Sequence, residues 1–133
     1  MSNESNKNQK ELDAYILNVL RLGTLSWHGR NKVFENAREK RQEGFKKDGS
    51  PKYKYYWHCA KCHLWHRDQA NFEADHIEEV GPLVNGDWTA LIKRLYANPD
   101  THWQCLCVLC HSKKTATYNA SRRYERKITE SPL

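Results

Sequence analysis

Four cysteines of this chain form two pairs with the spacing that zinc sites use. Cys59 and Cys62 make the first pair, and Cys107 and Cys110 make the second. Four thiolates are the tetrahedral set that structural zinc prefers, and a two-residue spacer lets both sulfurs of a pair face one ion. The spacing therefore predicts one structural Zn²⁺ that joins distant parts of the chain. A redox dithiol is the alternative, but there are two pairs and no thioredoxin-like βαβ pattern.

The fifth cysteine and three histidines lie close to these pairs. We expect Cys105 to be a free thiol, buried or partly exposed, rather than a fifth ligand. His58, His63 and His66 could also ligate a metal, but four cysteines already fill a tetrahedral shell. We expect these histidines on the surface or facing DNA.

A carboxylate and two imidazoles could hydrolyse a phosphodiester. Asp75 and His76 are adjacent, and His111 directly follows Cys110, so the zinc site would fix its position. An Asp and a His can bind a divalent cation, which stabilises charge at phosphorus. A histidine with a pKa near neutrality can activate water. An Asp-His pair alone is a weak signal, and a Cys-x-x-Cys-His motif beside it makes the combination more specific.

The charge distribution suits an enzyme that acts on a polyanion. The chain has 22 Lys and Arg residues against 16 Asp and Glu residues, a formal net charge of +6. Basic residues dominate 30–54 and 113–127, whereas 68–87 is acidic. Basic flanks could neutralise phosphates while an acidic centre holds a cation. Ordinary solvated helix faces would give a similar pattern in either flank.

The elements that must position these groups are short and polar. With 133 residues and a mean hydropathy of −0.96, the chain can bury little apolar surface, so a structural metal would help it fold. No apolar run is long enough to cross a membrane, and no signal peptide is visible, which predicts a cytoplasmic, reducing location. We expect disorder over 1–9, helices over 10–22, from 26 or 29 to 43, 88–96 and 108–127, strands over 53–58 and 72–77, and a loop or short strand over 101–106.

Two further local features follow from these ranges. Asp87 is a good N-cap for the helix that starts at Trp88, and Asp48-Gly49-Ser50-Pro51 predicts a turn. The aromatic run Tyr53, Tyr55, Tyr56 and Trp57 is expected to pack the N-terminal arm on the core rather than to stack on bases.

The motifs together resemble the HNH endonuclease family, with a ββα-metal core, and look most like small bacteriophage members. The resemblance covers about residues 53–115 and rests on the first Cys-x-x-Cys, Asp75-His76-Ile77, and Leu106-Cys-x-x-Cys-His-x-x-Lys-Thr115. A looser likeness extends upstream to Trp27, Arg30 and Ala37.

This resemblance implies a role for each site residue. His76 would be the general base, and Asp75 and His111 would bind the catalytic metal, with Mg²⁺ or Mn²⁺ expected. The family's middle asparagine corresponds to His102, which makes this an H-H-H variant. His102 would orient the base through a ring N–H, or it would become a third metal ligand and favour Ni²⁺, Co²⁺ or Zn²⁺.

Basic residues after His111 are candidates for DNA contact. Lys113 and Lys114 could reach the scissile phosphate, and Arg122, Arg123, Arg126 and Lys127 could form a stripe along the DNA backbone. A solvated helix surface is the alternative for all of them.

The sequence thus predicts an α+β protein with a zinc-braced ββα-metal core and a helical N-terminal arm. Residues 1–52 would form a disordered start and the arm, and residues 53–133 the nuclease domain with a basic C-terminal helix. The expected function is a metal-dependent DNA endonuclease that nicks duplex DNA as a monomer or weak dimer, in the host cytoplasm if phage-encoded. The alternatives are a packaging nuclease that assists a phage terminase, and a non-catalytic zinc module that binds nucleic acid.

Overall fold

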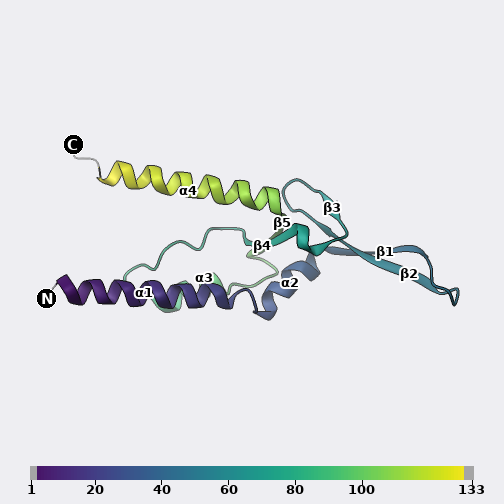
Figure 1. Cartoon of the computed structure of the whole chain (residues 1–133), viewed down its shortest axis with the longest axis horizontal. Helices are drawn as coiled ribbons and strands as arrows, with labels where there is room; N and C mark the ends of the chain where they lie inside the picture. Colours follow the sequence, from purple (N-terminus) through teal and green to yellow (C-terminus); the bar gives the residue numbers. More distant parts are fainter. Residues whose placement is uncertain (1–2, 131–133) are drawn as a thin grey trace. The chain divides into compact units, whose positions relative to one another are not determined.

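The protein is α+β, with four helices and two small sheets among its described residues (Figure 1). The computed structural model describes residues 3–130, and describes side chains for residues 4–125. The elements are α1 Asn3–Gly23, α2 His28–Asn36, β1 Arg38–Phe45, β2 Pro51–His58, β3 Trp65–His66, a short 3₁₀ helix Gln69–Asn71, β4 Phe72–His76, α3 Trp88–Leu95, β5 Trp103–Cys107 and α4 Val108–Glu130.

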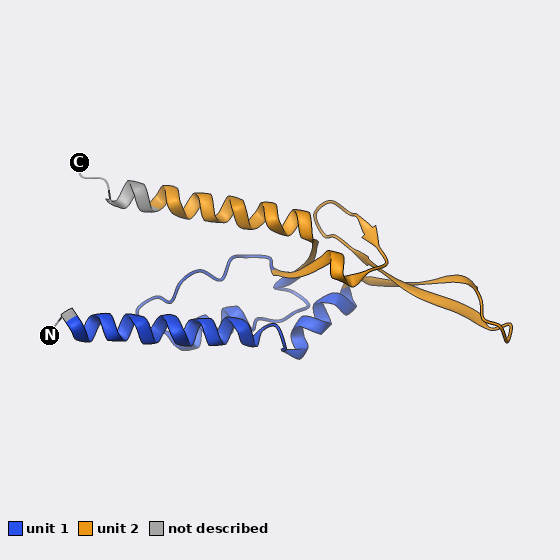
Figure 2. Ribbon diagram, in the orientation of Figure 1, with its two compact units in different colours: residues 1–36, 76–103 blue, residues 37–75, 104–133 orange. Residues whose placement is uncertain are grey.

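The chain folds into two compact units, each built from two separate segments (Figure 2). Unit 1 contains residues 1–36 and 76–103, and unit 2 contains residues 37–75 and 104–133. The chain therefore passes from one unit to the other three times, after Asn36, after Asp75 and after Trp103. The predicted boundary between residues 52 and 53 falls inside unit 2, within β2.

Helix α1 begins earlier than the sequence suggested. Residues 3–9 are helical, so the prediction of disorder over 1–9 is wrong there, and residues 1–2 lie outside the described part. Glu4, Lys7 and Gln9 favour a helix, and the Gln9 side-chain amide donates to Asp13 one turn later (2.8 Å). At the other end of α1, the Tyr96 hydroxyl donates to the carbonyl of Leu20 (2.7 Å), which links α1 to the end of α3.

Helix α3 has the cap that the sequence predicted. The Asp87 carboxylate accepts from the backbone N–H of Ala90 (3.0 Å). Leu91 and Leu95 are buried on the inner side of the helix, whereas Ile92 is 40% exposed. The helix thus presents one narrow apolar stripe to unit 1.

The segment after α2 is a strand, so the predicted helix to Glu43 is wrong beyond Asn36. Strand β1 pairs antiparallel with β2, with Arg38 opposite Trp57 and Lys40 opposite Tyr55. Residues 38–43 contain no apolar side chain for a helix face, whereas pairing with β2 gives their cations aromatic partners. The register shifts between Gln42 and Phe45, where Gly44 has a φ of +76°, a value that favours glycine.

A two-stranded sheet, most of whose residues belong to unit 2, runs directly into the last helix. Strands β4 and β5 are neighbours, and Phe72, Ala74 and Leu106 are buried there. Helix α4 starts at Val108, the residue after β5 ends, so no loop separates them. Strands β4 and β5 and helix α4 lie close to the strand, the short strand and the helix that the sequence predicted over 72–77, 101–106 and 108–127. Within the described residues, no helix has the length and apolar character needed to cross a membrane.

Candidate functional site

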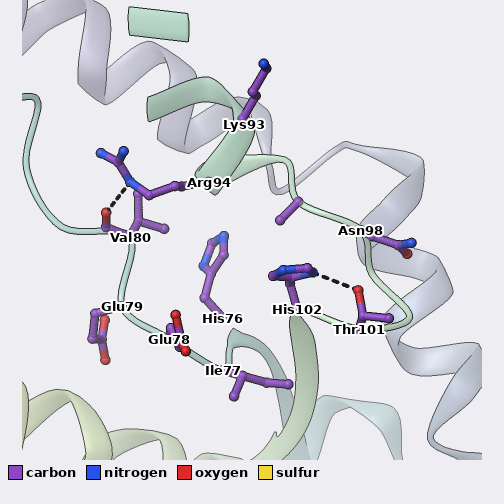
Figure 3. Close-up of a pocket in the computed structure, with 11 residues that line it drawn as sticks. His76, Ile77, Glu78, Glu79, Val80, Lys93, Arg94, Asn98, Thr101 and His102 are labelled. Carbon is purple, nitrogen blue, oxygen red and sulfur yellow. Dashed lines mark hydrogen bonds between the residues drawn. The ribbon is translucent and has the colours of Figure 1, made fainter. Parts of the chain in front are cut away.

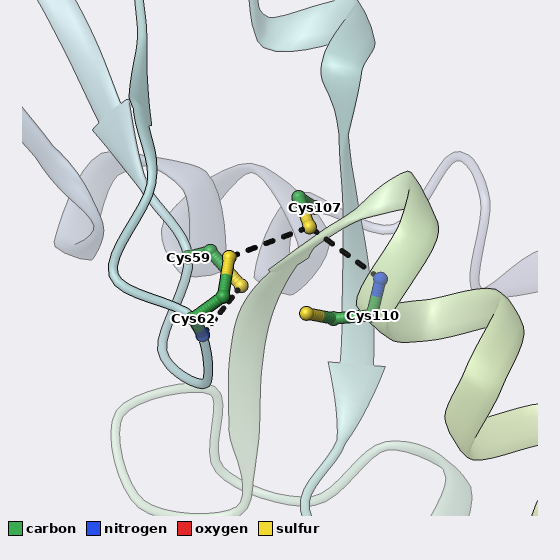
Figure 4. Close-up of side chains that lie close together, drawn as sticks. All are labelled: Cys59, Cys62, Cys107 and Cys110. Carbon is green, nitrogen blue, oxygen red and sulfur yellow. Dashed lines mark hydrogen bonds between the residues drawn. The ribbon is translucent and has the colours of Figure 1, made fainter.

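Four cysteine sulfurs of unit 2 converge on one point (Figure 4). The Sγ atoms of Cys59, Cys62, Cys107 and Cys110 all lie within 4.8 Å of one another. In each pair the second residue's backbone N–H donates to the first residue's sulfur, at 3.5 Å for Cys62 and 3.4 Å for Cys110. Four thiol ligands at these separations fit a structural metal such as zinc, as the sequence predicted.

Backbone hydrogen bonds hold the first pair against the second. The turn after Cys59 closes through the N–H of His63, which donates to the Cys59 carbonyl (3.0 Å), and His63 has a φ of +64°. The N–H of Ala60 donates to the carbonyl of Cys105 in β5 (2.9 Å). The cluster therefore joins the end of β2, the end of β5 and the start of α4.

Cys59, which belongs to the sulfur cluster, and Cys105, which does not, are both buried but differ in acidity. Burial favours the neutral thiol of Cys59, but backbone hydrogen bonds from Cys107, Cys62 and Lys61 outweigh it and lower its pKa to about 6. Burial raises the pKa of Cys105 to about 12, and the neighbouring charges of Cys59 and Cys107 add to the effect. Cys105 lies outside the sulfur cluster and is 3% exposed, which fits the buried free thiol expected from the sequence.

Asp75 and His111 lie beside each other in unit 2. The Nε2 atom of His111 is 3.6 Å from Oδ1 of Asp75. The other oxygen, Oδ2, accepts from the ammonium of Lys114 (2.6 Å) and from the side-chain amide of Gln104 (2.9 Å). Asp75 is buried near the end of β4, and its polar neighbours come from β5 and the first turns of α4.

This pair is close to the spacing that two ligands of one cation require. With metal–ligand bonds of about 2.1 Å, two donor atoms on one ion lie roughly 3.0–3.4 Å apart, depending on geometry. The Oδ1–Nε2 separation of 3.6 Å needs only a small side-chain adjustment to reach that range. Asp75 and His111 could therefore hold a divalent cation while Lys114 stays on the second carboxylate oxygen.

In unit 1, His76 and His102 line a single pocket of about 490 Å³ (Figure 3). Glu78, Glu79, Lys93 and Arg94 also line it, so charges of both signs surround the two imidazoles. Apolar side chains, among them those of Ile77 and Val80, line it as well.

The ring of His76 is held by the main chain. Its Nε2 is 2.9 Å from the carbonyl oxygen of Leu95, the last residue of α3. A carbonyl only accepts, so Nε2 carries the proton, and a neutral ring has its lone pair on Nδ1. The ring also packs against Trp103, with centroids 3.7 Å apart. This arrangement suits a general base that acts through Nδ1.

His102 has partners of its own. Its Nδ1 is 2.7 Å from the hydroxyl oxygen of Thr101, as Figure 3 shows. Its backbone carbonyl accepts from the N–H of Ile77 (2.9 Å), which places His102 next to the residue that follows His76. The sequence analysis expected His102 to orient the ring of His76, or to bind the metal. The ring of His76 instead has the Leu95 carbonyl as a partner, which the sequence did not predict.

The six basic residues proposed for DNA contact have different surroundings. Lys113 is exposed, whereas Lys114 is half-buried on Asp75. Arg122 lies over the Tyr118 ring at 5.6 Å, and the Nε–H of Arg123 donates to the Asn119 carbonyl (3.4 Å). The side chains of Arg126 and Lys127 lie outside the described residues.

Sequence reasoning missed Gln104, Trp103, the Leu95 carbonyl and the ion pair of Lys114 with Asp75. Lys114 stands three residues after His111, so both share a helix face, and that spacing could have suggested a common partner. The other contacts join residues distant in sequence, for which the chain carries no local signal. Comparison of the chain with protein-family models, curated proteins and solved structures finds no match.

Proposed function

We propose that this protein is a metal-dependent DNA endonuclease of the HNH type that nicks duplex DNA. The observation that supports it best is the Asp75–His111 pair in unit 2, placed by a helix that starts inside the cysteine cluster. A structural metal in the cysteine cluster would fix the start of α4 and therefore the position of His111 relative to Asp75. Catalysis on phosphate requires such a fixed position, because the geometry of the ligands determines where the catalytic cation lies.

Asp75 and His111 would hold the divalent cation, which when bound stabilises negative charge at phosphorus and on the leaving oxygen. His76 would take a proton on Nδ1 from a water molecule as that water attacks phosphorus. The bond from phosphorus to the 3′-oxygen then breaks, and the 3′-oxygen receives a proton from solvent. The products are a 5′-phosphate and a 3′-hydroxyl. The peptide bond between Asp75 and His76 keeps ligand and base as neighbours in the chain.

The test is nicking of supercoiled plasmid by the wild type and by His76→Ala after catalytic metals are removed. Mg²⁺, Mn²⁺, Ni²⁺ or Zn²⁺ is then added singly, and bound zinc is measured in each protein. We expect nicking with at least one metal and a loss of 10²-fold or more, as an order of magnitude, in His76→Ala. Asn31→Ala, which changes an exposed residue of unit 1, is the control and should nick like the wild type.

A zinc module that binds nucleic acid without cleaving it is the second candidate. The 2.6 Å contact between Lys114 and Asp75 favours it, since this ion pair already compensates the carboxylate without a metal. A wild type that shifts DNA on a gel yet nicks with none of the four metals would establish this candidate and refute the nuclease.

A further inference from the structure

The β1–β2 ribbon has two faces of different chemistry. Directly paired residues of antiparallel strands share a face, and faces alternate along each strand. The pairing therefore assigns one set to what we call the basic–aromatic face: Arg38, Lys40, Gln42, Tyr53, Tyr55 and Trp57. It assigns the other set to what we call the mixed face: Glu39, Arg41, Lys54 and Tyr56, with Glu43 joined to it by contact.

On the basic–aromatic face each cation lies over a tyrosine ring. The guanidinium of Arg38 is 4.2 Å from the centroid of Tyr55, and the ammonium of Lys40 is 4.5 Å from that of Tyr53. Both rings are exposed, 40% for Tyr55 and 49% for Tyr53, so the expectation that they pack on a core is wrong. This face carries no carboxylate.

The mixed face neutralises its own charge. Arg41 is 3.3 Å from the carboxylate of Glu39. Glu43 accepts from the Tyr56 hydroxyl, and its carboxylate is 3.8 Å from the ammonium of Lys54. Arg41 and Lys54 thus have carboxylate partners, whereas no such ion pair of Arg38 or Lys40 is found among the described residues.

The ribbon also concentrates the positive charge of the chain. Residues 38–58 contain seven Lys or Arg residues and three Asp or Glu residues, a net charge of +4 within a chain of +6. A dense polyanion is the partner that complements a surface of this kind, and duplex DNA carries one charge per about 1.7 Å of helix axis.

We infer that the basic–aromatic face of the β1–β2 ribbon is a docking surface for duplex DNA. A two-stranded ribbon fits the major groove, which is about 12 Å wide, and its cations can reach the phosphates that border the groove. The tyrosine rings hold the side chains of Arg38 and Lys40 near the strand, which reduces the entropy lost when they bind. The inference deepens the proposed function, because it names the surface by which the nuclease would engage its substrate.

The test compares two charge-neutralising double variants on the same ribbon. Arg38→Gln with Lys40→Gln removes two charges from the basic–aromatic face, and Arg41→Gln with Lys54→Gln removes two from the mixed face. Binding to a short fluorescent duplex is measured by anisotropy at several salt concentrations without added divalent cation. Circular dichroism and zinc content confirm that each variant is folded.

We expect the first variant to bind roughly tenfold more weakly and the slope of log affinity against log salt to become shallower by about 1.8, since each phosphate that a cation neutralises contributes about 0.9. The mixed-face variant should stay within about twofold of the wild type. Equal losses in both variants, or no loss in either, would overturn the inference. A preference for single strands that Tyr53→Leu abolishes would also overturn it, because the rings would then be stacking on bases.

Plasmid nicking by the same proteins separates this inference from the proposed function. If the wild type never nicks but the first double variant loses DNA binding selectively, the docking surface stands and the nuclease proposal fails. If the wild type nicks and the first double variant binds and nicks equally well, the docking surface fails and the nuclease proposal stands.

Discussion

The carboxylate of Asp75 shares its two oxygens among three partners. His111 faces one oxygen, and Lys114 and Gln104 donate to the other. A buried carboxylate is costly unless its charge is compensated, and here a lysine compensates it. The ammonium of Lys114 would repel a cation placed on the other oxygen, so we expect this lysine to weaken any metal binding by Asp75 and His111.

Replacing Lys114 should test that expectation. In Lys114→Gln the ammonium leaves Asp75, so we expect Mn²⁺ to bind about tenfold more tightly, while the metal-free protein loses about 1–3 kcal/mol of unfolding free energy. Titration calorimetry and chemical unfolding measure the two effects. The exposed neighbour provides the control, since Lys113→Gln removes the same charge from the same helix. Equal Mn²⁺ affinity in both variants would show that Lys114 does not guard the carboxylate.

A methyl group at Gly29 should disturb the aromatic packing around His76. A Cβ there would lie 2.4 Å from the nearest ring carbons of Trp27, which must shift. Trp27 packs against Trp103, and Trp103 packs against His76. We expect Gly29→Ala to lose about 1–2 kcal/mol of unfolding free energy despite the better helix propensity of alanine, and to nick DNA more slowly. Asn31→Ala on the exposed side of α2 is the control, and a Gly29→Ala protein equally stable by thermal unfolding would contradict the argument.

At the scale of elements, the junction of β5 and α4 brings three candidate site residues together within five positions of the chain. Cys107 ends the strand, Cys110 lies in the first turn of the helix, and His111 follows. Because no loop intervenes, a metal in the cysteine cluster would fix the start of α4 and with it the direction in which His111 points.

Removing one ligand should release the metal and loosen that junction. In Cys110→Ser we expect bound zinc to fall from one equivalent towards none and unfolding free energy to drop by roughly 3 kcal/mol or more. Cys105→Ala is the control, because that cysteine is buried nearby but lies outside the cluster. Its zinc content should stay at one equivalent. Elemental analysis and thermal unfolding report the two quantities, and zinc loss in Cys105→Ala alone would reverse the assignment.

The turn between β1 and β2 should respond to acid. Hydrogen bonds from the Ser50 hydroxyl and then from its backbone N–H lower the pKa of Asp48 from its usual value. A carboxyl with a lowered pKa stabilises the folded turn above its ordinary pKa, and that stabilisation disappears as pH falls through the lowered value. Carbon-detected NMR titration should show this shift, and Ser50→Ala should move the pKa of Asp48 back up. An unchanged pKa in Ser50→Ala would remove the proposed cause.

The sequence predicted elements whose signals are local and missed those decided by pairing. The cap at Asp87, the turn at Asp48 and the two cysteine pairs follow from short-range chemistry, and all are present. Strand β1 reads as helix in the sequence because its charged residues specify no period of their own and depend on the aromatic partner strand. The contacts of Gln104 and of the Leu95 carbonyl were missed for the same reason, since folding alone brings these distant residues together.

At the scale of the whole molecule, the four cysteines that could hold a structural metal all belong to unit 2. Unit 1 has instead an aromatic cluster in which the Trp27 ring packs against Tyr96 and Trp103. The two units therefore depend on different interactions for their stability. Their candidate site residues also differ: Asp75 and His111, proposed to bind a metal, lie in unit 2, and both pocket histidines lie in unit 1.

Chelation of the structural metal should therefore act unevenly along the chain. We expect hydrogen exchange to accelerate most over 37–75 and 104–130 and far less over 3–36 and 76–103, because local stability follows local interactions. Mass spectrometry of peptic fragments before and after chelation measures it. Re-addition of Zn²⁺ should restore protection. A uniform acceleration across both units would mean that the metal supports the whole molecule equally.

The division of each unit into two chain segments also has a consequence during synthesis. Cys62 emerges from the ribosome 45 residues before Cys107, its partner across the sulfur cluster. At a translation rate of roughly 5–20 residues per second, the first cysteine pair waits for a few seconds with its thiols open to oxidants or to other metals. Helix α1 is made still earlier, before any residue of α3 exists to cover it. If the four cysteines hold zinc, the nascent chain needs reducing surroundings until Cys107 and Cys110 have been made and the site can close.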